Sequence, residues 1–459
     1  MQPVRRIRRV STPFAIFIGI IVGTLLTRFI PSFLFSAYST AWRGSAHAPI
    51  HTHTHAKATS SRQTTPPTLE QRRRVLDILS TISPHHTRGC NRNLNPLYVH
   101  QARDRYASLI GHSPPPSKSW LFDLGLGLLD PFPRPSQEET SLYSHRRDLS
   151  GGEHKYFFAI NLYNSFDIIP DLFATLFRVS AILGYHNVFV SIYENGSTDQ
   201  TKAVLRIFDA LARSVGLRVT IRTSQRTRGA FNHRIEYLAE VRNAAFVPLH
   251  DLRNAENEYF DTIIFMNDIL PCVDDVLELI YQSRLNNAGI TCATDYMFHE
   301  DLVCTPSRAS LSVADYSAQG SPVFYDNWVA RDINGTALEN APFEAIFHDG
   351  GSSMRFQQHL PVQVQSCWNG IAVLDPAPFY QPKRVRFRMA GIAEGECSAS
   401  ECSLICNDYW EAGYGRILMV PRVKLAYDQV RRVTSVPTFV PDTCACLTAS
   451  FRYHSSSAT

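Results

Sequence analysis

Short apolar runs alternate with longer amphipathic segments between residues 156 and 294, and this alternation constrains the fold more than any other feature. The apolar runs predict strands at 156–162, 187–193, 217–223, 261–266 and 289–294. Helical spacing fills the intervals at 167–184, 200–215, 233–246 and 272–286. This order predicts an α/β fold with a mainly parallel sheet and helices on both faces. Ligands of such folds bind beyond the carboxyl ends of the strands.

Charge is divided unevenly along the chain. Residues 1–137 hold 17 basic and 5 acidic residues, whereas the remainder holds 28 basic and 36 acidic ones. The first part also holds 14 of the 27 prolines, which excludes a uniform globular chain. A hydrophobic content of 44% excludes a wholly disordered one. Nucleic acid is not an expected partner, because the body that would have to bind it is acidic.

The N-terminus carries a targeting signal. Four arginines between residues 5 and 9 precede an apolar run over 14–35 that Arg28 interrupts. The pattern predicts a cytosolic tail at 1–13 and a signal-anchor transmembrane segment at 14–35. A cleaved signal peptide is the alternative. Either reading places the rest of the chain in the secretory lumen or outside the cell.

Residues 36–150 are expected to form a stem, because Ser, Thr, His and Pro dominate their composition. Short helices are predicted within it at 69–82 and 96–110. The alternating His51, His53 and His55 are more typical of a solvated stalk than of a metal site. A body large enough for one α/β domain follows at 151–445, and a tail at 446–459.

Nine of the ten cysteines follow residue 151, and five of them follow residue 390. In an oxidising lumen these five are expected to form disulfides that clamp the C-terminal segment: Cys397, Cys402, Cys406, Cys444 and Cys446. The spacing does not determine their pairing. It is also a poor match to a zinc site.

Polar clusters follow two of the predicted strands. Residues 194–199 (ENGSTD) come directly after a strand and open a helix, so their backbone N–H groups can meet an anion. An ordinary helix cap is the alternative reading. Asn267 and Asp268 end another strand, and a carboxylate there suits Mg²⁺ or Mn²⁺, although turn chemistry is the more common explanation for such a pair taken alone.

A third cluster, Ser366-Cys367-Trp368-Asn369-Gly370, lies between strand-like segments at 362–365 and 371–374. It is either a hairpin turn or a sugar-binding surface with an exposed indole face. Between the second and third clusters, a long region with few regular elements carries aromatic and acidic residues, which is typical of functional loops. They include Asp295, Tyr325, Asp326, Trp328, Arg331 and Asp332.

Seven segments in a fixed order resemble a known family. They are NLYNS (161–165), LGYHNVFVSIYENGSTDQT (183–201), RIEYLAEVRN (234–243), FMNDIL (265–270), YDNWVARDINGT (325–336), VQSCWNGIAVLDPAPF (364–379) and SECSLICNDYW (400–410). Together they resemble the cryptococcal α-1,3-mannosyltransferase and capsule-associated protein family of fungi, glycosyltransferase family 69. The resemblance covers roughly residues 155–430.

The resemblance implies a GT-A-like fold in a single-pass type II protein of the Golgi or secretory pathway. It also implies transfer of mannose from GDP-mannose to a glycan acceptor with retention, assisted by Mn²⁺ or Mg²⁺. By position, the donor would meet Asn161, Glu194, Asn195, Ser197, Asp199, Arg242 and Asn243. The sugar and acceptor would face Asp295, Trp328, Trp368 and Asn369, and Asp268 would hold the metal.

Two points stay open in this comparison. Many GT-A enzymes have acid-x-acid where this chain has Asn267-Asp268, so the second metal ligand is not identified. Asp326 and Asp332 are candidate nucleophiles, with a structural role in a loop as the alternative. The rival functions are a non-catalytic luminal protein of polysaccharide assembly and a transferase that uses another donor, such as UDP-xylose or UDP-glucose.

Overall fold

The computed structural model describes residues 67–83, 90, 105–110, 154–225, 227–228, 233–299, 321–341, 346–382 and 384–425. Two compact units divide the chain, Met1–His51 and Thr52–Thr459, and the described residues all belong to the second. The predicted cytosolic tail, signal-anchor and C-terminal tail lie outside them. Within the described ranges, no helix combines the length and the apolar character that a membrane crossing needs.

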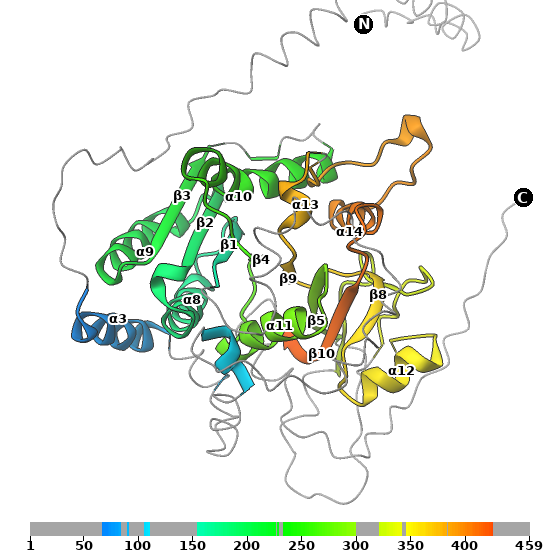
Figure 1. The fold of residues 1–459 in the computed structure, drawn as a ribbon, viewed down its shortest axis with the longest axis horizontal. Coiled ribbons are helices and arrows are strands. Elements are labelled where there is room, and N and C mark those ends of the chain that lie inside the picture. Colours follow the sequence, from blue (N-terminus) through cyan, green and yellow to red (C-terminus); the bar gives the residue numbers. More distant parts are fainter. Residues whose placement is uncertain are drawn as a thin grey trace, which may run out of the picture. The chain divides into compact units, whose positions relative to one another are not determined.

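A ten-stranded sheet runs through the second unit in the order β3-β2-β1-β4-β9-β5-β10-β8-β7, with β6 beside β5 (Figure 1). Its first five strands in the chain are β1 (Tyr156–Leu162), β2 (Val188–Asn195), β3 (Arg218–Ser224), β4 (Thr262–Met266) and β5 (Ile290–His299). The others are β6 (Ser321–Phe324), β7 (Arg331–Asp332), β8 (Val362–Ser366), β9 (Ile371–Leu374) and β10 (Ile417–Leu425).

The sheet is mixed rather than mainly parallel. Strands β3, β2, β1 and β4 run parallel, as predicted. Strand β9 then lies antiparallel between β4 and β5, and β8 lies antiparallel to β10. Strands β8 and β9 are not neighbours, so the 366–370 turn is not the connection of a hairpin. Apolar runs predicted the strands, but β9 is as apolar as the strands that run parallel, so its run does not reveal that it is antiparallel.

Helices cover both faces of the sheet. They are α3 (Leu69–Ile82), α8 (Ile169–Leu183), α9 (Thr201–Val215), α10 (Arg234–Glu256), α11 (Val273–Leu285), α12 (Gly350–Gln357), α13 (Ala377–Tyr380) and α14 (Glu401–Glu411). Short 3₁₀ turns lie at Ala107–Ile110, Tyr185–Asn187 and Ile392–Glu394. Helix α10 runs ten residues past its predicted end, because Pro248 is accommodated inside it.

The central strands divide their side chains between two hydrophobic cores. In β1, Phe158 and Ile160 pack into the core formed with α3, α8, α9 and α11. Phe157 and Ala159 pack into the opposite core, which residues of α10, α13 and α14 complete. Burial of one such side chain stabilises the fold by about 1.5–3 kcal/mol. Two-sided burial explains why β1 is an unbroken apolar run.

Part of the expected stem belongs to the folded body. Val75 and Leu79 of α3 are buried in the first core, beside α8 and α9. Further along, Arg105 and Tyr106 both donate hydrogen bonds to the Glu278 carboxylate on α11, at 2.6–2.8 Å. Residues 67–83 and 105–110 therefore form a strap on the body. Most of the predicted helix at 96–110 lies outside the described residues.

Disulfides are present, but not where they were expected. Cys90 is bonded to Cys272, and Cys292 to Cys367. Cys397, Cys402 and Cys406 are free thiols, and Cys444 and Cys446 lie outside the described residues. Cys402 and Cys406 are buried on α14, where burial raises the pKa of both thiols. The prediction from clustering in the sequence was therefore wrong for these three residues.

Candidate active site

The strand register gathers the polar clusters at one edge of the sheet. Leu162 at the end of β1 pairs with Glu194 on β2, and Ile160 pairs with Met266 at the end of β4. Met266 also pairs with Ile371, the first residue of β9. The segments 161–165, 194–199, 267–268 and 368–370 therefore meet at the carboxyl edge, as the strand order predicts.

Helix α10 contacts these segments one after another along its length. The Tyr237 hydroxyl accepts a hydrogen bond from Asn195 Nδ2 at 3.3 Å. One turn later, the Val241 carbonyl accepts one from Asn161 Nδ2 at 2.9 Å. Arg242 follows and donates to Asn267 Oδ1 at 2.9 Å. This helix therefore aligns the ends of β1, β2 and β4.

Arg242 lies at the centre of the candidate site. Its Nε donates to Glu401 Oε1 at 2.9 Å, and both side chains are almost fully buried. Its guanidinium carbon lies 5.0 Å from the ring centroid of Phe265, 5.2 Å from that of Trp368 and 5.7 Å from that of Phe387. The cation is held by rings and a carboxylate, which fixes its position. Glu401 was not predicted, because nothing near it in the sequence suggests a partner on α10.

The turn after β2 is held by its own side chains. Glu194 accepts a hydrogen bond from the Ser197 backbone N–H, and Ser197 Oγ accepts one from Asn164 N at 2.9 Å. Asp199 accepts from Thr201 N at 3.0 Å and Phe166 N at 3.1 Å. Burial opposes these bonds, but they outweigh it and lower the pKa of Asp199. Ser197 and Asp199 therefore shape the turn before α9. This agrees with the alternative prediction that residues 194–199 form an ordinary helix cap.

Two acceptor oxygens at this edge are buried and receive no hydrogen bond from the described residues. They are Asn161 Oδ1 and Glu194 Oε2, the latter 3.8 Å from Lys202 Nζ. A buried oxygen without a donor costs about 1–3 kcal/mol. A bound hydroxyl or N–H group would satisfy both oxygens, which fits the donor-binding role expected of these two residues.

Two further carboxylates lie within electrostatic reach of the Arg242 charge. Desolvation of its carboxyl raises the pKa of Asp268 against the opposing charge of Arg242, although the residue is exposed at the surface. Burial likewise raises the pKa of Asp326, with Arg242 again opposing. Asp326 Oδ1 accepts a hydrogen bond from Val329 N at 3.2 Å. Asp268 and Asp326, expected from the sequence as separate candidates, thus both experience the charge of Arg242.

Asp295 and Asn369 form a buried pair beside these carboxylates. Asn369 Nδ2 donates to Asp295 Oδ1 at 2.6 Å, and the Asp326 backbone N–H donates to the same oxygen at 3.3 Å. Both side chains are inaccessible to solvent. They connect β5, the 366–370 turn and the Asp326 turn, so they position the site instead of facing a sugar directly.

Three further expected residues have structural surroundings. Both ends of the Asn243 amide bond the Phe387 backbone, at 2.7 and 3.0 Å. Trp368 is buried with its ring beside Phe265 and Phe387, so its indole face is not available to a sugar. Asp332 Oδ1 accepts from Asn334 N and Thr336 N at 2.9 and 2.8 Å, which closes a turn. In the sequence, none of these contacts can be distinguished from a ligand contact.

The metal expected from the resemblance can be tested against the donor set. Within the described residues, no three His, Cys, Asp or Glu side chains form a cage for a metal ion. Asn267 Oδ1 accepts a hydrogen bond from Arg242 and is not free to bind a metal. Of Asn267 and Asp268, this leaves the exposed Asp268 carboxylate as the candidate ligand. One carboxylate fits the mode in which Mg²⁺ takes most of its ligands from substrate phosphates and water.

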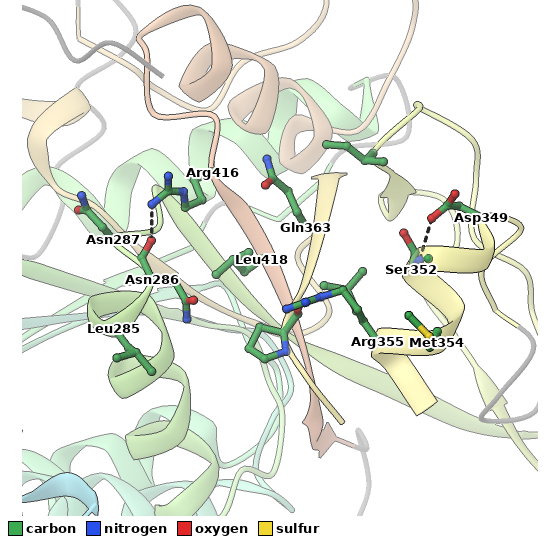
Figure 2. A pocket seen from close by; sticks show the side chains of 14 residues that line it. Leu285, Asn286, Asn287, Asp349, Ser352, Met354, Arg355, Gln363, Arg416 and Leu418 are labelled. Atoms are coloured by element: carbon green, nitrogen blue, oxygen red, sulfur yellow. Dashed lines mark hydrogen bonds between the residues drawn. The ribbon is translucent and has the colours of Figure 1, made fainter. Parts of the chain in front are cut away.

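A cavity of about 740 Å³ lies elsewhere, next to the starts of β5 and β10 and against α12 (Figure 2). Its two arginines are bonded to backbone carbonyls. Arg416 donates to the Asn286 carbonyl at 2.8 Å, and Arg355 donates to the Pro361 carbonyl at 2.8 and 3.0 Å. None of the predicted site residues lines this cavity, so it is separate from the candidate site around Arg242.

Two solved structures show limited similarity to the chain. S. aureus TarS matches over 61% of this chain and 63% of its own, with 12% identity and a TM-score of 0.32. The mannosyltransferase PcManGT from Pyrobaculum calidifontis, in complex with GDP-Man and Mn²⁺, matches over 77% and 68%, with 12% identity and a TM-score of 0.34. Scores this low carry no conclusion about fold or function.

Sequence comparison is more informative. The chain is 35% identical over 277 residues to the α-1,3-mannosyltransferase CMT1 of Cryptococcus neoformans, which covers 57% of this chain and 55% of that protein. The chain thus spans about half the length of this curated relative. The family model described as Cryptococcal mannosyltransferase 1 matches residues 155–408, which run from β1 into α14 and include Arg242, Asp268, Asp326 and Glu401. The chain therefore belongs to the Cryptococcal mannosyltransferase 1 family.

Proposed function

We propose that this protein is a retaining, metal-assisted mannosyltransferase that moves mannose from GDP-mannose to a glycan acceptor. The observation that carries the proposal is that Asp268 and Asp326 both lie within electrostatic reach of the almost fully buried Arg242. Membership of the mannosyltransferase family supports the choice of sugar. As a type II protein of the Golgi or secretory pathway, it would act in the lumen.

The donor would lie across the ends of β1 and β2. Glu194 Oε2 and Asn161 Oδ1 would accept hydrogen bonds from the nucleoside, since both oxygens are buried without a donor. Asn195, held by Tyr237, would line the same pocket. The diphosphate would then point toward Asp268 at the end of β4. Asn243 is left out of this arrangement, because the Phe387 backbone uses its amide.

The divalent cation would be held by Asp268 together with donor phosphate oxygens. When bound, it would neutralise negative charge that develops on the departing diphosphate. Arg242 contributes a positive field from a fixed position, although Glu401 already compensates much of its charge. Such preorganised charge is worth most in a site that excludes water.

Asp326 is the candidate for the sugar side of the reaction. Its raised pKa reflects burial, and Val329 N–H and the Asp295 pair fix its orientation. Retention requires either a covalent intermediate or attack from the face that GDP leaves. In both cases a carboxylate next to the anomeric carbon stabilises the cationic character of the transition state. Asp332 has no such role here, because its carboxylate closes a turn.

The test is mannose transfer by an Asp268→Asn variant with GDP-mannose, Mn²⁺ and a mannoside acceptor. We expect kcat to fall by about 10²–10³, as for loss of one strong electrostatic contact in a transition state. An Asp251→Asn variant is the control, because Asp251 lies on the exposed side of α10. This variant should transfer mannose at the wild-type rate. Equal rates for wild type and Asp268→Asn would refute the assignment.

The rival functions give different results in the same assay. A non-catalytic assembly protein would release no GDP from GDP-mannose with any mannoside. A transferase with another donor would be inactive with GDP-mannose but stabilised by its own nucleotide sugar in a thermal-shift screen, because a ligand that binds the folded state raises Tm. GDP-mannose, UDP-xylose and UDP-glucose with Mn²⁺ form the minimal panel.

A further inference from the structure

Two segments of the chain have the acceptor sequence for N-linked glycosylation, Asn-x-Ser/Thr. They are Asn195-Gly196-Ser197 and Asn334-Gly335-Thr336. This modification joins the asparagine side chain to a sugar, and the hydroxyl two residues later belongs to the recognised pattern. A glycan on a folded protein needs an asparagine that faces solvent, because the attached sugars are bulky and strongly hydrated. The surroundings of the two asparagines therefore decide which of them can carry one.

The fold excludes Asn195. This residue is 8% exposed, and its Nδ2 atom donates a hydrogen bond to the Tyr237 hydroxyl at 3.3 Å. Ser197 is 6% exposed, and its Oγ atom accepts a hydrogen bond from Asn164 N at 2.9 Å. A sugar on Asn195 Nδ2 would break the contact with α10 and would have to lie inside the packed turn. Only an unmodified Asn195 fits this arrangement.

Asn334 has the opposite surroundings. Asn334, Gly335 and Thr336 are all exposed, and neither the Asn334 nor the Thr336 side chain forms a hydrogen bond with another described residue. Backbone groups build the turn instead. Asp332 Oδ1 accepts from Asn334 N at 2.9 Å and from Thr336 N at 2.8 Å, and Asp332 N donates to the Thr336 carbonyl at 2.8 Å. The side-chain amide and hydroxyl can therefore be recognised or modified while the turn keeps its shape.

The Asn334 turn lies at the end of the sheet, where β7 is the last strand in the order. Strand β7 separates it along the chain from the turn that carries Asp326 and the half-exposed Trp328. The neighbouring Ile333 is exposed and lines the cavity beside α12, which contains none of the predicted site residues. A glycan on Asn334 would therefore begin beside that cavity and not in the candidate site, so it is compatible with the proposed activity.

We propose that Asn334 carries an N-linked glycan in the mature protein and that Asn195 does not. This inference rests on the luminal location in the proposed function, because the modification takes place in the secretory pathway. The sugar donor is an oligosaccharide linked to a lipid through a diphosphate. Asn334 Nδ2 forms a bond to the anomeric carbon of that oligosaccharide, and the bond from this carbon to the diphosphate oxygen breaks. Nδ2 loses one proton to solvent, and the lipid diphosphate leaves.

The test is to map the modified positions on the full chain, purified from a eukaryotic host. Digestion with an N-glycosidase in heavy-oxygen water converts each glycosylated asparagine into a labelled aspartate, which peptide mass spectrometry locates. We expect the label at position 334 and none at position 195. On gels, the digestion should increase the mobility of the wild type and of Thr336→Ser, which keeps the acceptor sequence. Asn334→Gln and Thr336→Ala should show no change in mobility.

An added acceptor sequence separates this inference from the proposed location. Glu256→Thr completes an acceptor sequence at Asn254, in the exposed last turn of α10. A glycan on Asn254 but not on Asn334 would overturn the inference and leave the luminal location intact, whereas no glycan at either position would overturn both. A glycan on Asn334 of a protein that transfers no sugar would support the inference while refuting the transferase assignment. A label at position 195 of the folded protein would overturn the exclusion of Asn195.

Discussion

At the scale of single residues, the Arg242–Glu401 pair should be among the most sensitive points of the molecule. Both groups are almost fully buried, so removal of one leaves an uncompensated charge in a water-poor environment. Glu401→Ala should lower the free energy of unfolding by about 3–5 kcal/mol, measured by denaturant titration. The matched control is Glu70→Ala, which removes an ion pair to Arg74 whose side chains are both 73% exposed. That change should cost less than about 0.5 kcal/mol, and comparable losses would contradict the buried-charge argument.

The position of Asp326 in the site should lower the stability of the fold. Burial raises the pKa of its carboxyl above the ordinary value, so the folded state favours the protonated form. The stabilising contribution of this group is complete below the unfolded-state pKa and is lost as pH rises through the folded-state value. At neutral pH the ionised carboxylate therefore destabilises the fold. Asp326→Asn should raise Tm at pH 7 by about 1–3 °C while lowering transferase activity.

Asp199 provides the comparison, because its pKa is shifted in the opposite direction to that of Asp326. Hydrogen bonds from Thr201 and Phe166 lower the pKa of its carboxyl despite the opposing effect of burial, so its contribution to stability is present above the unfolded-state pKa. It is lost as pH falls through the folded-state value. Asp199→Asn should therefore lower Tm at pH 7, and the two variants should converge on the wild type in acid. Parallel shifts in both variants would show that neither difference comes from ionisation.

At the scale of elements, the strand that presents Asp268 is held by a short connection to α11. The buried Thr175 Oγ1 donates to the Pro271 carbonyl at 2.7 Å, and the next residue, Cys272, is bonded to Cys90. Cys272 lies four residues after Asp268, so the disulfide ties Cys90, which lies between the two parts of the strap in sequence, to the segment that carries the proposed metal ligand. Cys90→Ser should lower the free energy of unfolding by about 2–4 kcal/mol and reduce mannose transfer. Cys397→Ser removes an exposed free thiol and should change neither, as measured under non-reducing conditions.

The elements also show what the sequence can predict. Strands β1, β2 and β4 are apolar on both faces, so an unbroken run reveals them, and the turns that follow hold the polar residues of the site. Strand direction and disulfide partners depend on contacts between distant segments: β9 inserts antiparallel between β4 and β5, and Cys272 pairs with a residue 182 positions away. For the same reason Glu401 was missed, and Trp368, which resembles a sugar-binding residue, is part of the core.

At the scale of the whole molecule, the folded body should need the strap for its full stability. Val75 and Leu79 complete the core beside α8, and Arg105 supplies the ion pair to Glu278. Loss of two buried aliphatic side chains and a disulfide removes at least about 5 kcal/mol. A protein that begins at residue 111 should therefore melt about 10–20 °C below the full chain, or fail to fold.

A protein that begins at residue 67 keeps the strap. In detergent-free buffer, we expect this truncated protein to retain the Tm and the transfer rate of the full chain. Scanning calorimetry of the two truncated proteins beside the full chain makes the comparison direct. If the protein starting at residue 111 melts with the full chain, α3 and the Cys90–Cys272 bond would be dispensable attachments. The difference in Tm thus measures how far a segment with the composition of a stem has become part of the fold that holds Asp268.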